Sequence, residues 1–149
     1  MRYIHQSRQY YQDLARAMMT RYETDPEDFA WVWECSFEQF HAFLYVGFDR
    51  SDQHEADPLW RSLYDLCEKA EEKWVRAQPW PKFASYESVT SHRPFKDRLG
   101  VVEHISESQQ EAYVHWTSGG GNFWPKKTIL WNQPSKELLE ANGISTDNL

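Results

Sequence analysis

The chain has few cysteines and glycines and no long apolar run, and these shortages exclude several classes of protein. Its 149 residues contain only Cys35 and Cys67, which are too few for a zinc site or a disulfide framework, so we expect buried free thiols. No apolar stretch approaches the roughly 18–20 residues that span a membrane. The polar N-terminus lacks the apolar core of a secretory signal. The sequence therefore predicts a cytoplasmic protein without membrane association.

The short motifs that mark common active sites are also missing. No Gly-x-Ser-x-Gly or His-Glu-x-x-His pattern occurs. The three glycines from Gly119 do not make a phosphate loop, because Gly121 is followed by Asn122 instead of Lys-Ser/Thr. We expect no catalytic residue, cofactor or metal, although catalytic groups can also meet only in the folded chain.

Basic residues are scarce in the middle of the chain. The net charge is −7, but fourteen acidic and three basic residues between Glu23 and Glu72 give that stretch a net charge of −11. Nucleic-acid binding needs a basic surface, so this acidic block argues against it. It favours attraction of a basic protein partner, or it solvates helix surfaces.

Aromatic residues, by contrast, are abundant: eight Trp, eight Tyr and eight Phe make up 16% of the chain. Disordered chains are poor in such residues, so the chain is expected to fold despite a mean hydropathy of −0.82. Large rings can fill a core, line a cavity or anchor an interface.

Helical periodicity dominates the first half. Apolar residues predict a helix that ends near Thr24, and Asp25-Pro26 signals the start of a second helix over residues 29–48. In an alternative interpretation, residues 29–35 form a strand and Ser36 with Gln39 caps a shorter helix. After a loop at residues 47–56, Asp57-Pro58 begins a third helix that ends before Pro79.

The second half shows the alternating residue pattern that is typical of strands. Strands are predicted at residues 86–90, 99–105, 112–117 and 128–131, with residues 118–122 as a mobile connection, and Ser135 then caps a short helix that ends at Asn142-Gly143. The expected fold is α+β, with N-terminal helices packed on a curved C-terminal antiparallel sheet. It forms one domain, residues 1–149, that is helical over about 1–78 and strand-rich over about 84–132, followed by a short helix and tail.

Two histidines could meet across the predicted hairpin. If the hairpin is symmetric about Gln109 and Gln110, His104 lies opposite His115, with Glu103 beside them. Such groups could line a pocket, bind a metal or share a proton, but no third ligand is visible nearby and a one-residue shift in register separates the histidines.

An acidic and aromatic surface is the leading candidate for binding a partner. The rings of Trp31, Trp33 and Trp60 would supply binding energy, and the carboxylates near them in the sequence would speed association. The candidate residues are Glu27, Asp28, Trp31, Asp49, Asp52, Glu55, Asp57 and Trp60. The same residues could instead form a solvated surface over a tryptophan-rich core.

Residues 99–108, Leu-Gly-Val-Val-Glu-His-Ile-Ser-Glu-Ser, and residues 111–116, Glu-Ala-Tyr-Val-His-Trp, resemble the hairpin of NTF2-like immunity proteins of bacterial polymorphic toxin systems. The resemblance implies an NTF2-like fold and a protein that binds and blocks a cognate toxin, without an active site. The sequence thus favours an immunity or inhibitor protein with a basic partner. The alternatives are a small-molecule-binding protein or small enzyme with a pocket between helices and sheet, and an oligomerisation module.

Overall fold

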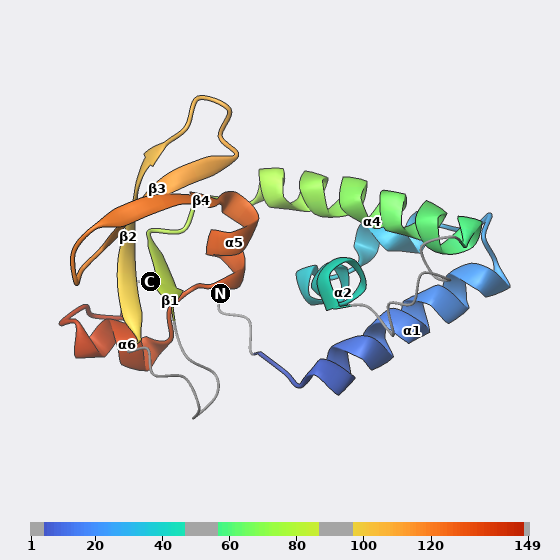
Figure 1. Cartoon of the computed structure of the whole chain (residues 1–149), viewed down its shortest axis with the longest axis horizontal. Helices are drawn as coiled ribbons and strands as arrows, with labels where there is room; N and C mark the ends of the chain where they lie inside the picture. Colours follow the sequence, from blue (N-terminus) through green and yellow to red (C-terminus); the bar gives the residue numbers. More distant parts are fainter. Residues whose placement is uncertain (1–4, 47–56, 87–96, 148–149) are drawn as a thin grey trace. The chain divides into compact units, whose positions relative to one another are not determined.

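The computed structural model describes residues 5–46, 57–86 and 97–147, which fall into two compact units (Figure 1). Residues 6–77 form a helical unit, and residues 78–149 with the first five residues form a unit that contains a four-stranded antiparallel sheet. The predicted α+β class, with N-terminal helices and a curved C-terminal antiparallel sheet, is confirmed. Among the described residues, no helix has the length and apolar character needed to cross a membrane.

The first helix, α1, spans Arg8–Thr24 and ends where the sequence predicts. Ser7 caps its start, because the Ser7 side chain accepts a hydrogen bond from the Tyr10 backbone N–H. One side of α1 is buried and supplies Met18, Met19 and Tyr22 to the core of the helical unit.

The continuous helix predicted over residues 29–48 is wrong, and so is the alternative strand at residues 29–35. The structure has a 3-10 helix, η1 (Ala30–Glu34), then α2 (Phe37–His41) and a π-helical segment, η2 (Ala42–Val46). Cys35 is extended, with φ −62° and ψ 150°, which interrupts the helix. The capping box is present: Ser36 Oγ accepts from the Gln39 N–H at 3.2 Å, and Gln39 Oε1 accepts from the Ser36 N–H at 2.9 Å.

The long helix α4 spans Pro58–Ala77, as predicted, and stops before Pro79. Asp57 stabilises its start, since its Oδ1 accepts the Leu59 N–H at 2.9 Å. Leu63, Cys67 and Ala70 line its buried side and complete the core of the helical unit. The residues predicted as the preceding loop, 47–56, lie outside the described part of the chain.

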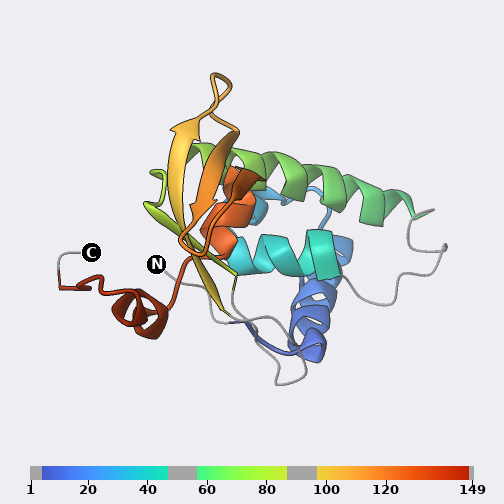
Figure 2. The same cartoon turned by 60° about the vertical axis from the view of Figure 1, so that its left-hand side comes forward.

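The sheet is an antiparallel meander of β1 (Phe83–Tyr86), β2 (Arg98–Ile105), β3 (Glu111–Trp116) and β4 (Gly121–Pro125), in sequence order. Figure 2 shows its curvature. β1 overlaps the strand predicted at residues 86–90 only at Tyr86 and begins three residues earlier, while residues 87–90 lie outside the described ranges. Ala112, Val114 and Trp116 of β3 face a small core that includes Ile129.

The symmetric register predicted for the hairpin is wrong. His115 pairs with Val101, and His104 falls at an irregularity between Glu103 and Ile105 where the register shifts. His104 has φ 47° and Gln109 has φ 58°, so both adopt left-handed backbone conformations. The bulge and the turn displace the pairing, and His104 does not lie opposite His115.

Near the end of the chain, the structure has a helix where the sequence predicts a strand. Residues 128–131 belong to a helix, α5 (Lys126–Trp131), while β4 begins at Gly121, within the predicted connection. Thr-Ile-Leu-Trp has a high strand propensity, but the helix buries Ile129, Leu130 and Trp131 together, and packing prevails. The last helix, α6 (Lys136–Ala141), is capped by Ser135 and followed by Gly143 at φ 75°, as the sequence predicts.

Candidate functional site

Residues 23–30, from the end of α1 to the start of η1, form an acidic exposed segment of the helical unit. Every residue of this segment is exposed, including Glu27 and Asp28. The local turn is ordered by Asp25, whose Oδ1 accepts the Asp28 N–H at 3.3 Å and whose own N–H donates to the Arg21 carbonyl at 3.3 Å. The carboxylates of this turn are therefore presented to solvent on a structured backbone.

Two exposed aromatic side chains adjoin the acidic segment. Phe29 is 42% exposed and Trp33 is 44% exposed. The short 3-10 helix places Trp31 and Val32 inward and leaves Trp33 outward. The Lys73 ammonium lies 5.5 Å from the centroid of the Trp33 ring, which gives this exposed ring a fixed neighbour on α4.

Trp31, expected on the sequence as part of a binding surface, lies in the core of the helical unit. It is only 7% exposed. The Arg21 guanidinium covers its ring at 4.6 Å from the centroid, and its carbonyl accepts the Cys35 thiol at 3.6 Å. Trp31 therefore packs on the inner side of η1, and Phe29 and Trp33 are the accessible rings. The sequence grouped Trp33 with Trp31 and Trp60 but did not single out Phe29.

Two further residues of the predicted binding surface, Asp57 and Trp60, lie at the start of α4. Asp57 is half-buried, and Trp60 stacks on Tyr64 with ring centroids 5.1 Å apart. The Arg61 guanidinium lies 5.9 Å from the Trp60 centroid. Asp49, Asp52 and Glu55 lie outside the described residues.

The acidic segment after α1 and Asp57 lie at one end of the helical unit (Figure 1). Tyr22 Oη and Ser62 Oγ are 2.7 Å apart, which joins the end of α1 to the early turns of α4. The segment that follows α1 and the Asp57 region therefore lie at the same end of this unit, as Figure 1 shows. We name the set Glu27, Asp28, Phe29 and Trp33 the acidic-aromatic surface.

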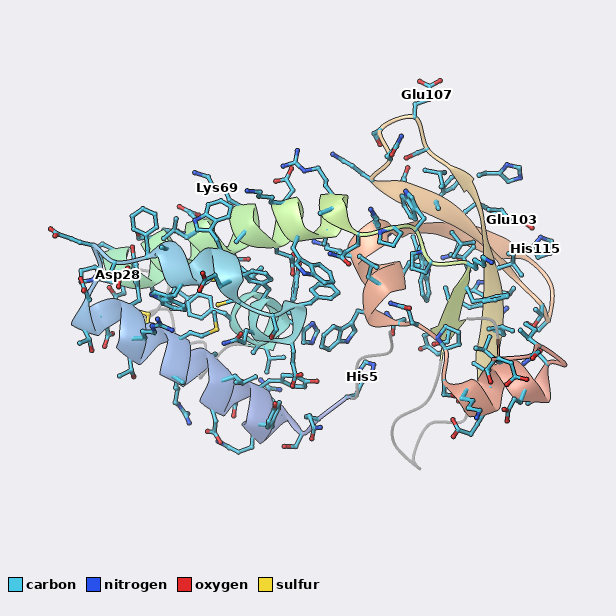
Figure 3. The ribbon with its side chains drawn as sticks, turned by 180° about the vertical axis from the view of Figure 1, so that it is seen from behind. His5, Asp28, Lys69, Glu103, Glu107 and His115 are labelled. Carbon is cyan, nitrogen blue, oxygen red and sulfur yellow. The ribbon has the colours of Figure 1, made fainter. Side chains whose placement is uncertain are left out.

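On the sheet, His115 contacts Glu103, whereas the sequence predicts that His115 lies opposite His104. Glu103 and His115 lie close together, with 3.8 Å between His115 Nδ1 and Glu103 Oε2 (Figure 3). Both side chains are partly exposed, at 41% and 56%. His104, on the bulge, does not join them through strand pairing. Within the described ranges, no group of three or more His, Cys, Asp or Glu side chains could hold a metal ion.

The buried titratable groups favour structure over nucleophilic chemistry. Burial raises the pKa of the Cys35 thiol to about 11, and burial also raises the pKa of the Cys67 thiol. A thiol that stays protonated at neutral pH is a poor nucleophile. Tyr45 donates a 2.7 Å hydrogen bond to Glu71 Oε1, and burial together with this bond raises the pKa of Tyr45.

No family model, curated protein or solved structure matches this chain.

Proposed function

We propose that this chain is a non-enzymatic binding protein, an immunity or inhibitor protein that neutralises a cognate toxin by binding it through the acidic-aromatic surface. The partner is a basic protein domain. The observation that carries the proposal is the run of eight exposed residues at 23–30, with Glu27, Asp28 and Phe29 in it and Trp33 beside it.

Exposed rings among carboxylates suit a protein interface. Aromatic side chains at an interface contribute large contact area with few rotatable bonds, and interface hot spots are enriched in Trp and Tyr. Phe29 and Trp33 are each more than two-fifths exposed, so they would lose that exposure on binding. The local turn and the Lys73 contact hold these groups before binding, which lowers the entropy cost of association.

The acidic charge of the helical unit favours a basic protein as partner. The stretch from Glu23 to Glu72, with its net charge of −11, lies entirely within the helical unit. Such a field accelerates the approach of a positively charged protein and repels acidic ones. A basic toxin domain fits this field.

The choice of a toxin as partner rests on the resemblance of residues 99–116 to the hairpin of NTF2-like immunity proteins. Helices followed by a curved antiparallel sheet are compatible with that resemblance. An immunity protein needs affinity and specificity for its toxin and no active site.

The test has two stages. The whole chain is used as bait at low salt, and the captured basic protein is then expressed in a bacterial host with and without this chain. We expect the captured protein to arrest growth alone and the chain to restore growth. A captured protein that does not harm the host would contradict the toxin assignment.

A charge-reversed bait separates surface-specific capture from general attraction. Glu27→Lys with Asp28→Lys should lose the partner and the growth rescue. Glu107→Lys with Asp147→Lys makes the same change in net charge on exposed residues of the other unit and should retain both. Equal loss in the two variants would show that net charge alone causes capture.

A further inference from the structure

A second aromatic surface lies on the sheet, on the side opposite the Ala112, Val114 and Trp116 core. Tyr113 on β3 and Phe123 on β4 are directly paired in register. Their ring centroids are 5.4 Å apart and their planes are inclined by 72°. Phe123 is 54% exposed, the largest fraction among the exposed large apolar side chains in the described ranges.

Gly121 lets the Tyr113 ring lie across β4. A Cβ at this position would stand 2.5 Å from Tyr113 Oη and 2.6 Å from its Cζ, much closer than any real contact. The ring therefore occupies the space that a side chain at residue 121 would need. Together with Phe123 it forms an aromatic surface that spans two strands.

Carboxylates border these rings. Glu103 on β2 is the direct partner of Tyr113, and Glu111 precedes Tyr113 by two residues on β3, so both share its side of the sheet. Glu111 is exposed, and Glu103 has His115 at 3.8 Å. Ring faces and carboxylates both attract cations, and a planar guanidinium can stack on a ring while its N–H groups bind a carboxylate.

The backbone of β4 adds a docking edge to this surface, because β4 is the last strand of the sheet that the described residues form. The Trp116 N–H donates to the Gly120 carbonyl at 2.9 Å, and the Lys126 N–H donates to the Gln110 carbonyl at 2.8 Å. Antiparallel strands alternate the direction of these groups, so the N–H and C=O of Gly121 and Phe123 point away from β3. An edge of this kind can pair with an extended segment of another protein.

We propose that the β4 edge and the Tyr113–Phe123 surface bind an extended protein segment that carries arginine. The segment pairs with the outward backbone groups of Phe123. A side chain opposite Phe123 then stands on the same side of the sheet, beside the Phe123 ring. Its guanidinium stacks on that ring and donates to Glu111. This site does not depend on the proposed function, since it lies in the other unit.

The test is an NMR titration of the whole ¹⁵N-labelled chain with the peptide acetyl-Thr-Arg-Val-Arg-Thr-amide. The control peptide replaces both arginines by citrulline, which keeps the shape and removes the charge. We expect the arginine peptide to shift the amide signals of Gly121 and Phe123, and the citrulline peptide to bind more weakly.

Variants identify the groups that bind the cation. Phe123→Ala and Glu111→Gln should each lower the affinity for the arginine peptide about two- to five-fold, the factor typical of exposed cation–π and ion-pair contacts. Glu107→Gln removes an exposed carboxylate at the hairpin turn and should leave the affinity unchanged.

Three results would overturn the proposal. One is equal binding of the arginine and citrulline peptides. Another is equal affinity in the Phe123→Ala, Glu111→Gln and Glu107→Gln proteins. The third is a change of the β4 amide signals with protein concentration alone, which would assign the edge to a second copy of the chain.

Discussion

Tyr22 and Ser62 are joined by a hydrogen bond of 2.7 Å between their hydroxyl oxygens, forty residues apart in sequence. Tyr22 is the last buried residue of α1, and Ser62 lies in the early turns of α4. The bond therefore fixes the point at which the chain leaves α1 and enters the acidic segment. Its position relative to α4 sets where the carboxylates of residues 23–28 are presented.

Removing the Tyr22 hydroxyl should weaken this connection. Tyr22→Phe should lower the free energy of unfolding by about 0.5–1.5 kcal/mol, the usual net contribution of a hydrogen bond. Ser62→Ala should cost a similar amount, measured by urea denaturation. The double variant should lose little more than either single variant, because both remove the same bond. Fully additive losses would contradict a direct interaction.

Gly100 should tolerate no side chain, because it is buried on β2 against two large neighbours. A Cβ there would stand 2.4 Å from Val114 Cγ1 and 3.0 Å from Trp116 Cε3. Gly100→Ala should therefore destabilise the sheet by about 1–3 kcal/mol, as overpacking does. The measurement is the urea midpoint of the purified protein.

A second substitution tests whether steric overlap is the cause. Val114→Ala removes the methyl group nearest the added Cβ, so Gly100→Ala should cost less in that background than in the parent chain. An unchanged cost would locate the strain in the backbone of β2.

The helices α1 and α4 were predictable because each has a clear apolar stripe, and Asp57-Pro58 also marked the start of α4. Ser36 also signalled its capping box, but the aromatic residues from Phe29 satisfied helical and strand periodicity alike. The structure follows neither pattern, since residues 30–34 form a 3-10 helix that ends at the extended Cys35. The sequence pattern could not identify the structure of this segment, because its aromatic residues could be buried by either a helix or a strand.

The sequence did not predict the register of the hairpin or the position of the last strand. His104 takes a left-handed conformation at a bulge, so counting outward from Gln109 and Gln110 gave the wrong partners. The pair that does meet, Glu103 and His115, belongs to diagonal positions on one side of the sheet. Among the candidate binding residues, Trp31 and Trp33 are indistinguishable in sequence, and only the 3-10 turn separates the buried ring from the exposed one.

The two tryptophans of η1 should respond oppositely to truncation. Trp31→Ala should cost about 3–5 kcal/mol, because it empties a buried site in the helical core. Trp33→Ala should cost about 1–3 kcal/mol, less than Trp31→Ala, since the ring is 44% exposed and only the covered part of it and the Lys73 contact are lost. Partner capture should fail in Trp33→Ala while the fold survives. A folded Trp33→Ala protein that binds normally would remove Trp33 from the acidic-aromatic surface.

Alkaline pH should destabilise the helical unit through Cys35. Burial raises the pKa of this thiol from 9.0 to about 11, so the folded state favours the protonated form. The stabilisation is complete below pH 9 and is lost as the pH rises towards 11. Urea midpoints at pH 8 and pH 10.5 should therefore converge partly in Cys35→Ala, compared with the parent chain. Parallel pH profiles of the two proteins would contradict this linkage.

The most direct test of the central claim is the association rate of the captured partner, measured by stopped flow at low and high salt. Glu27→Lys with Asp28→Lys should slow association about ten-fold or more at low salt. The difference should nearly vanish at ~1 M salt, where the Debye length is about 3 Å. Glu107→Lys with Asp147→Lys should cause a much smaller change. Equal association rates for the parent chain and the Glu27/Asp28 variant at low salt would contradict binding through the acidic-aromatic surface.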